Sequence, residues 1–161
     1  MDDSVIDIPK GSFPKAAHLL KHSDFQRVYQ QGRRHFSGNM TVFYLLPANE
    51  AAPGVNGVWT AKSMRAHKEG DVRVGFTVSK ALGGSVDRNR MRRRTREAVR
   101  HHLHMLQETS IAVDVVINPK RSLLAVEFGL ISQEIERAFR VIRKNCEAAE
   151  KKSGKQEARR G

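Results

Sequence analysis

The chain has 161 residues, 39% of them hydrophobic, which suits one domain with one modest core. Its 29 Lys and Arg against 17 Asp and Glu give a formal charge of +12, so we expect a polyanionic partner, nucleic acid before an anionic membrane. A single cysteine excludes an intramolecular disulfide, and no apolar run is long enough to span a bilayer. The acidic N-terminus lacks the apolar segment of a secretory signal, which favours the cytoplasm.

The N-terminal part of the chain contains one predicted helix. Residues 1–18 carry scattered Pro and Gly without sustained periodicity, and we expect a mobile leader there. Ser23 is a suitable N-cap for a short helix that ends at Gly32. The spacing places Phe25, Val28 and Tyr29 on one face of this helix.

Strand-forming residues dominate three further segments, 40–46, 73–78 and 111–117. A short additional strand is expected near residues 35–37. Between the first two segments, residues 48–71 are rich in Gly, Pro, Ala and Asn, which predicts an extended loop insertion.

Two long amphipathic helices follow from apolar residues that recur every three or four positions. The first runs from Ser85 to about Gln107 and turns a common apolar face toward the sheet, formed by Met91, Ala98, Val99, Leu103 and Leu106. The second carries apolar residues from Ile131 to Cys146. Residues 149–161 lack an apolar anchor and are expected to form a frayed basic tail. The predicted order is α-β-β-β-α-β-α, a single α+β domain around a four-stranded sheet.

The first long helix carries an unusual concentration of arginine, seven residues between positions 88 and 100. Asn89, Arg93, Arg96 and Arg100 step by four, three and four, so they form one stripe opposite the apolar face. Arginine pairs bidentately with phosphate and stacks on exposed bases. A solvated charged face is the ordinary alternative, but such a density of like charges weakens a free helix and favours a polyanionic partner.

The segment VGFTVSKALGGSVDRNRMRRRTREAVR, from Val74 to Arg100, resembles the signature of the bacterial ribonuclease P protein component. The resemblance lies in a strand that ends in Val-Ser-Lys, a Gly-containing turn, Arg-Asn-Arg, basic pairs and a closing Arg-Glu. It extends over roughly residues 19–145 and implies one domain at 19–148. It also implies a mixed four-stranded sheet with a left-handed βαβ crossover, which spacing alone does not predict.

The resemblance implies two functional surfaces. The helix surface expected to bind the catalytic RNA consists of Arg88, Asn89, Arg90, Arg92, Arg93, Arg96 and Arg100. A cleft for the single-stranded 5′ leader of precursor tRNA would contain Phe25, Tyr29 and Phe43, with Lys80 at its rim. Ordinary core packing is the alternative for these aromatic residues. The sequence departs from the family pattern at Ala81, Gly84 and 118–121, which puts contacts at those positions in doubt.

The implied activity is that of a subunit that assists a catalytic RNA in removing the 5′ leader of precursor tRNA. The Mg²⁺ would be bound mainly by the RNA, since the acids of the chain are dispersed and His101, His102 and His104 complete no metal-binding pattern. No catalytic residue, metal ligand or obligate protein partner is predicted. Two alternatives remain: a structural RNA-binding protein similar to a ribosomal protein, and a DNA-binding regulator, which lacks a helix-turn-helix pattern here.

Overall fold

The computed structural model describes residues 13–46, 72–109 and 112–160, so the loop expected at 48–71 and most of the expected leader lie outside the described residues. The helices are α1 (His22–Gln31), α3 (Ser85–His102), α4 (His104–Gln107) and α5 (Phe128–Arg160). The strands are β1 (Arg33–Phe36), β2 (Met40–Leu45), β3 (Val72–Phe76) and β4 (Val113–Pro119). Short 3-10 turns are η1 (Lys15–Ala17), η2 (Lys80–Leu82) and η3 (Arg121–Leu124).

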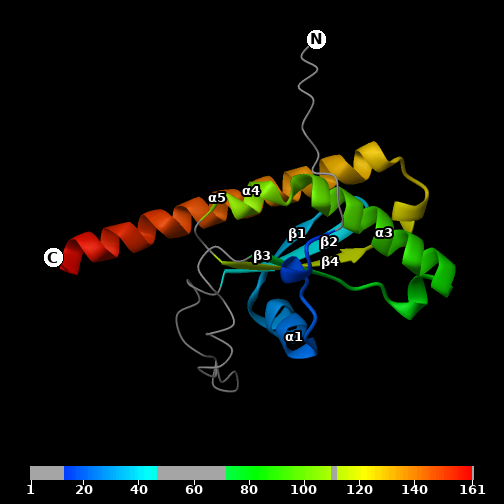
Figure 1. Ribbon diagram of the computed structural model, residues 1–161, viewed down its shortest axis with the longest axis horizontal. Coiled ribbons are helices and arrows are strands. Elements are labelled where there is room, and N and C mark those ends of the chain that lie inside the picture. Colours follow the sequence, from blue (N-terminus) through cyan, green and yellow to red (C-terminus); the bar gives the residue numbers. More distant parts are fainter. Residues whose placement is uncertain (1–12, 47–71, 110–111, 161) are drawn as a thin grey trace, which may run out of the picture.

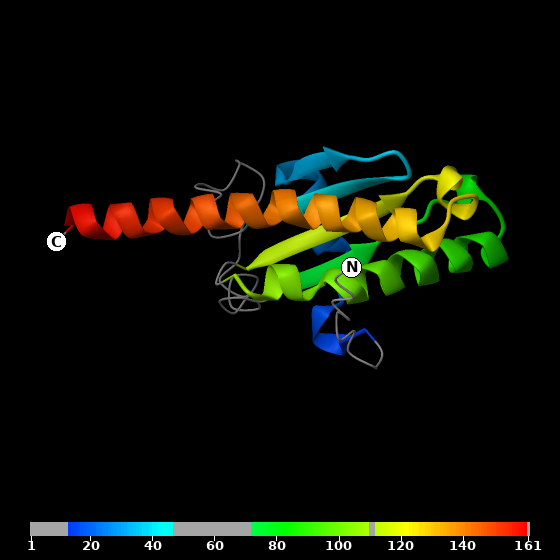
Figure 2. The same cartoon turned by 90° about the horizontal axis from the view of Figure 1, so that it is seen from above.

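The four strands form one mixed sheet in the order β1-β2-β4-β3. β1 and β4 each pair with β2 in antiparallel fashion, whereas β3 and β4 are parallel. The parallel pair is joined through α3, which runs back in front of the sheet in Figure 2, and the resulting crossover is left-handed. The α+β class, the element order and the expected crossover are therefore confirmed.

Helices cover both faces of the sheet (Figure 1): α3 and α5 lie on one face and α1 on the other. The main core lies between the sheet and the two long helices. The five apolar residues predicted for the inner face of the first long helix are all buried, as are Ile131, Ile135 and Phe139 of α5. The periodicity therefore identified the core faces correctly.

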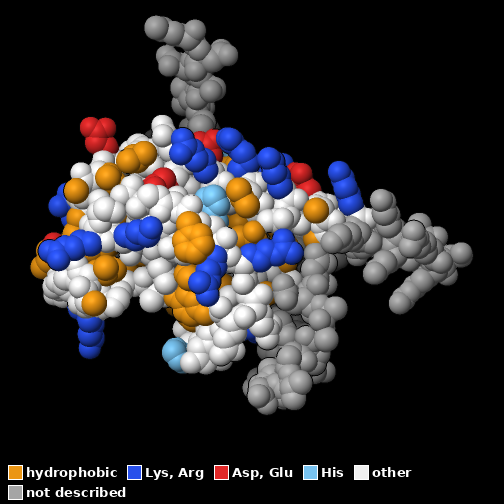
Figure 3. Space-filling model, turned by 180° about the vertical axis from the view of Figure 1, so that it is seen from behind, with side chains coloured by type: hydrophobic (Ala, Val, Ile, Leu, Met, Phe, Trp, Pro, Cys, Tyr) orange, Lys and Arg blue, Asp and Glu red, His pale blue; other side chains and the backbone are white. Residues whose placement is uncertain are grey.

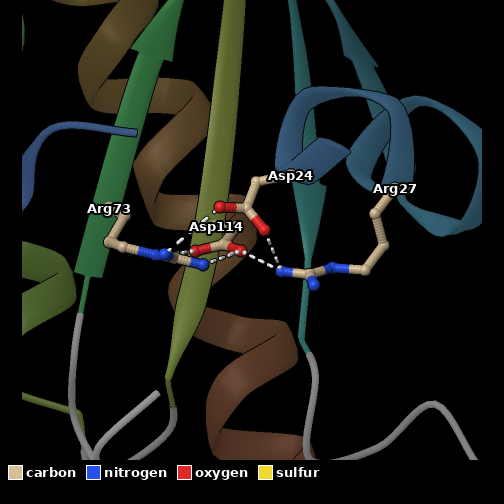
Figure 4. A network of polar contacts seen from close by, with 4 residues as sticks. All are labelled: Asp24, Arg27, Arg73 and Asp114. Carbon is tan, nitrogen blue, oxygen red and sulfur yellow. Dashed lines mark hydrogen bonds and ion pairs between the residues drawn. The ribbon is translucent and has the colours of Figure 1, made fainter. Parts of the chain in front are cut away.

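A smaller core and a charge network hold α1 against the opposite face. Val28 packs with Leu45 and Val116 beneath the sheet. Beside this cluster, four charged residues of α1, β3 and β4 meet (Figure 4), namely Asp24, Arg27, Arg73 and Asp114. The Asp114 side chain is fully buried between Arg27 Nη2 at 3.1 Å and Arg73 Nη2 at 2.9 Å. Packing and ion pairing together fix α1 relative to the strands.

The start of the domain lies upstream of the predicted boundary at residue 19. Phe13, Ala17 and Leu19 are buried, and the Leu19 amide donates to the Val74 carbonyl at 3.0 Å. The prediction that all of residues 1–18 form a mobile leader was therefore wrong for the last part. Because these buried residues fix the approach of the chain, α1 begins at His22 after an extended Lys21, and Ser23 does not cap it.

The other predicted helix ends differ in two places. The helix expected from Ser85 to Gln107 divides at Leu103 into α3 and α4. The backbone stays helical to Arg160, so the frayed tail predicted at 149–161 was wrong for residues 149–160, and residue 161 lies outside the described residues. Ala149 is buried, and most residues after it are good helix formers, which favours continuation of α5. The predicted end of α1 at Gly32 is confirmed: a Cβ there would lie 2.4 Å from the Val28 carbonyl oxygen.

Candidate nucleic-acid interface

The basic helix α3 begins after a tight turn. The Ser79 hydroxyl accepts a hydrogen bond from the Ala81 amide at 3.2 Å, and Gly83 adopts a φ of 149°, which favours glycine. A Cβ added to Gly84, the N-cap of α3, would meet nothing within 4 Å. The space around Gly84 therefore admits the asparagine that the family pattern has there.

Four of the predicted RNA-binding residues lie together around a hollow on the outer side of α3. Its lining consists of Val86, Asn89, Arg92, Arg93 and Arg96. Arg92 Nη1 donates to Asn89 Oδ1 at 3.0 Å, and the Arg96 guanidinium carbon lies 5.8 Å from the centre of the Phe76 ring. These contacts orient two guanidinium groups without neutralising them. Val86, which is 78% exposed, is a member of this set that the charge pattern did not predict.

The arginines at this surface lack acidic partners within the described part of the chain. Arg88, Arg90, Arg93 and Arg96 make no ion pair there, and Arg92 is bonded only to the neutral Asn89. The Nε atoms of Arg88 and Arg96 are buried and have no hydrogen-bond partner among the described atoms. The helix therefore presents positive charge that an external anion can balance.

Two other arginines of α3 are engaged within the protein. Arg94 donates to the carbonyl oxygens of Leu123, at 2.6 Å, and Val126, so it ties α3 to the segment before α5. Arg100 forms an ion pair of 2.5 Å with Glu97. The hydrogen bond from Arg100 lowers the pKa of Glu97 to about 2. Arg100, predicted to bind RNA, is thus already paired with an acid.

The histidines near the end of α3 take different roles. His101 lies 3.0 Å from Glu97 Oε1, and His102 Nε2 lies 2.8 Å from the Ser132 hydroxyl of α5. Burial lowers the pKa of His102. Among the described residues, no group of three or more His, Cys, Asp or Glu side chains is placed to hold a metal ion. In the same ranges, no helix combines the length and apolar character needed to cross a membrane.

The three predicted aromatic residues meet beneath the sheet. Phe25, Tyr29 and Phe43 are partly buried against the smaller core, and the Tyr29 and Phe43 rings pack edge to face with centres 4.8 Å apart. Phe25 lies directly under Gly75, where a Cβ would come within 2.4 Å of its ring. Partial burial gives these rings a structural role and leaves part of their surface accessible.

Polar contacts fix the Tyr29 ring. Its hydroxyl lies 2.9 Å from both Thr77 Oγ1 and Asn118 Oδ1. Asn118 belongs to the segment 118–121 in which the sequence departs from the family pattern. Here the amide therefore helps to hold one ring of the aromatic surface.

Comparison with known proteins shows the family of the chain. Residues 13–143 match the family described as Ribonuclease P. The chain belongs to the ribonuclease P family. The ribonuclease P protein component of Citrifermentans bemidjiense is 30% identical over 133 residues, which cover 83% of this chain and 94% of the relative. That of Geobacter sp. strain M21 is 31% identical over 134 residues, with the same coverage.

Solved structures of ribonuclease P proteins share this fold. That of the Staphylococcus aureus protein has a TM-score of 0.55 at 23% identity, covering 80% of this chain and 96% of the solved one. That of the Thermotoga maritima protein has a TM-score of 0.52 at 16% identity, covering 76% and 94%. At such identities the likeness concerns the fold alone.

The ribonuclease P fold brings together most of the predicted site residues, with three qualifications. Arg88 and Arg90 lie on α3 but do not line the hollow. Arg100 is paired with Glu97. Lys80 is exposed in η2, and no described contact joins it to the aromatic rings.

Two residues of β1 were missed. Arg34 places its guanidinium carbon 5.5 Å from the centre of the Phe43 ring, and Phe36 is 69% exposed. Alternation along the sequence RRHF puts both on one face, but which face depends on the pairing with β2. A register was not predictable for so short a strand.

Proposed function

We propose that the chain is the protein subunit of a ribonuclease P, which assists a catalytic RNA in the Mg²⁺-dependent endonucleolytic removal of the 5′ leader from precursor tRNA. Membership of the family supports this proposal, and its relatives are named as a protein component, one part of a composite enzyme. The proposal assigns phosphodiester hydrolysis and the Mg²⁺ ions to the RNA. The protein contributes electrostatic stabilisation and substrate positioning.

The observation that carries the proposal is the set of arginines on α3 that have no acidic partner among the residues that the structure describes. We assign Arg88, Asn89, Arg90, Arg92, Arg93 and Arg96 to the contact with the catalytic RNA. The hollow lined by several of these residues offers guanidinium groups to phosphate oxygens from more than one direction. Arg100 joins this surface only if an RNA phosphate competes with Glu97.

We assign the opposite face of the sheet to the unpaired leader of the substrate. Tyr29 and Phe43 offer aromatic surface, and the Arg34 guanidinium lies over one of these rings. Aromatic faces beside cations bind single strands with little sequence preference. Because the sheet lies between this face, which carries α1, and the helix α3, one protein can contact both the catalytic RNA and the substrate (Figure 1).

Reconstitution tests the function. The protein freed of RNA should not cleave precursor tRNA, whereas addition of a catalytic RNA of ribonuclease P with Mg²⁺ should yield the mature 5′ end. The rate at low salt and limiting Mg²⁺ should exceed that of the RNA alone. If the protein alone cleaves precursor tRNA and this activity persists after micrococcal nuclease has degraded any bound RNA, the chemistry belongs to the protein. RNA binding without any gain in cleavage would favour a structural RNA-binding role instead.

A further inference from the structure

Phe36 is a large apolar side chain that the protein leaves uncovered on the face that also carries α1. In the register of β1 with β2, Arg34 lies opposite Phe43 and Phe36 lies opposite Thr41. Residues two apart on a strand share a face, so Phe36 and Phe43 are diagonal neighbours, with Cα atoms roughly 7–8 Å apart. The cation over the Phe43 ring confirms that Arg34 stands on this face.

These side chains continue the aromatic surface to the edge of the sheet. Tyr29 touches Phe43 edge to face, Arg34 covers part of Phe43, and Phe36 follows on the outermost strand. We call Phe36, Arg34 and Phe43 the β1 strip. The view from behind Figure 1 shows apolar side chains gathered among Lys and Arg side chains on this side of the molecule (Figure 3). The aromatic surface therefore extends from Tyr29 on α1, across Phe43, to Phe36 on the edge strand β1.

The hairpin that carries Phe36 is held rigidly. Glu134 of α5 is buried and accepts hydrogen bonds from the Asn39 amide nitrogen at 2.9 Å and the Asn39 side chain at 3.0 Å. The Lys120 amide donates to the Asn39 carbonyl at 2.8 Å. The turn after Phe36 is therefore anchored both to a helix and to the neighbouring strand, which preorganises the strip for binding.

The charge around the β1 strip suits a polyanion. Asp24 and Asp114 are the only acidic residues of α1 and the four strands, and both are held in ion pairs with Arg27 and Arg73. Lys120 Nζ lies 3.1 Å from the carbonyl oxygen of Ser37, next to Phe36. Two cations therefore lie near Phe36 in the structure, Arg34 two residues before it and Lys120 at the carbonyl of the next residue, which favours a nucleic acid strand over an acid-poor peptide.

We propose that Phe36 and Arg34 form a further stacking site, which binds one unpaired nucleotide beyond those held at Tyr29 and Phe43. The occupant is single-stranded RNA, and within the proposed function it is the more distant part of the precursor leader. The base stacks on Phe36 while Arg34 and Lys120 contact phosphates. Addition of a protein strand to the free edge of β1 is less suited, because charged side chains on an edge strand hinder pairing.

Leader length tests the site. Precursor tRNAs with leaders that grow by one nucleotide are bound to the complex of full-length protein and catalytic RNA, and the affinity is compared between the wild type and Phe36→Ala. We expect equal affinities for short leaders and a loss of about five-fold or more once the leader reaches the strip. Phe36→Trp should restore the affinity, because it keeps an aromatic face.

Leu130→Ala is the matched control, since Leu130 is an exposed apolar residue of α5, on the opposite side of the sheet. This variant should leave the dependence on leader length unchanged. Sedimentation of Phe36→Ala and the wild type at equal concentration reports self-association. If the wild type forms a dimer that Phe36→Ala abolishes, the ring covers a second copy of the chain and the proposal is wrong.

The length series separates this inference from the proposed function. An equal loss for all leaders, or no loss at any length, overturns the β1 strip as a nucleotide site. If Tyr29→Ala still lowers the affinity for precursors in the same assay, the assignment of the leader to this face survives. If neither variant affects any leader, both assignments fail together.

Discussion

Arg73 and Asp114 lie side by side on the parallel strands β3 and β4, where the guanidinium donates two hydrogen bonds to the carboxylate. Arg73 Nε lies 3.0 Å from Oδ1 and Nη2 lies 2.9 Å from Oδ2. Asp24 and Arg27 of α1 complete the network (Figure 4). Because α1 also carries Phe25 and Tyr29, this charge network fixes the helix that forms one side of the aromatic surface.

We expect Asp114→Asn to lower the free energy of unfolding by about 3–5 kcal/mol, because it removes the buried negative charge that lies between the partly buried Arg27 and Arg73. Urea unfolding at neutral pH measures this change. The matched control is Glu136→Gln, which breaks an ion pair with Arg140 whose side chains are 41% and 59% exposed. That pair should contribute no more than about 1 kcal/mol. If the two substitutions lower the free energy of unfolding equally, the charge network does not stabilise the fold more than an exposed ion pair does.

The fold was predictable because its elements have strong local patterns. The apolar face of α3 has helical spacing, and the apolar strands alternate or are bounded by Pro and Asn. Local patterns did not indicate that Phe13 docks on the sheet, because its partners Phe76 and His18 come together only after folding. The break at Leu103 had no glycine or proline to mark it.

The site was predictable in part for the same reason. Helical spacing places Arg93 on the exposed stripe and leaves Arg94 off it, but it does not show that Arg94 reaches across to η3. Similarly, Asp114 in an otherwise apolar strand is a signal of a buried ion pair, but its partners depend on how β3 and α1 are placed. Tertiary contacts decide the role of each charge.

The adjacent arginines Arg93 and Arg94 should separate binding from stability. Arg93→Ala should weaken binding of the catalytic RNA and reduce the slope of log affinity against log salt by roughly 0.7–0.9, with stability unchanged. Arg94→Ala should instead cost about 1.5–3 kcal/mol of stability, because two carbonyl groups lose a charged donor. Salt titrations of RNA binding and urea unfolding are measured on both variants. The reverse pattern would place Arg94 in the RNA interface.

Glu97→Gln should free Arg100 for an RNA phosphate. If Arg100 reaches the catalytic RNA, the variant binds it more tightly and with a steeper salt dependence than the wild type. Glu136→Gln removes the same charge on α5 and controls for net charge alone. Equal gains in the two variants would exclude Arg100 from the interface.

The same substitution has a predictable pH dependence. The pKa of Glu97 is about 2 in the folded protein against 4.5 ordinarily, owing first to the hydrogen bond from Arg100. Its contribution to stability is therefore present above pH 4.5 and is lost as the pH falls toward 2. Since the Glu97 side chain is 47% exposed, we expect at most about 1 kcal/mol. Glu97→Gln should be less stable than the wild type at pH 7 and equal to it near pH 2.

His102 should make the protein less stable in mild acid. Burial between α3 and α5 lowers its pKa from 6.5, so the unfolded chain takes up a proton more readily. The contribution to stability is complete above pH 6.5 and declines as the pH falls below that value. His102→Gln should flatten the decline in unfolding free energy between pH 7 and 5. His22 is exposed, so His22→Gln should leave that decline unchanged. If His22→Gln also flattens the decline, burial of His102 is not its cause.

The Tyr29 ring and its hydroxyl should have separable effects on substrate binding. Tyr29→Phe keeps the ring against Phe43 but removes the contacts with Thr77 and Asn118, so it should cost about 1 kcal/mol of stability and preserve the precursor-to-mature affinity ratio. Tyr29→Ala removes the platform itself and should lower that ratio, with roughly 1–3 kcal/mol lost per stacked base.

Core damage by Tyr29→Ala could imitate this result, because truncation of a buried aromatic costs about 3–5 kcal/mol of stability. Thermal unfolding and affinity for the catalytic RNA are therefore measured on the same proteins. Mature tRNA has no leader, so its binding reports general damage, and the ratio isolates the leader contact. If the Tyr29→Ala protein is folded and assembled and its precursor-to-mature affinity ratio equals that of the wild type, the aromatic cluster is purely structural. The leader would then have to bind elsewhere on the complex.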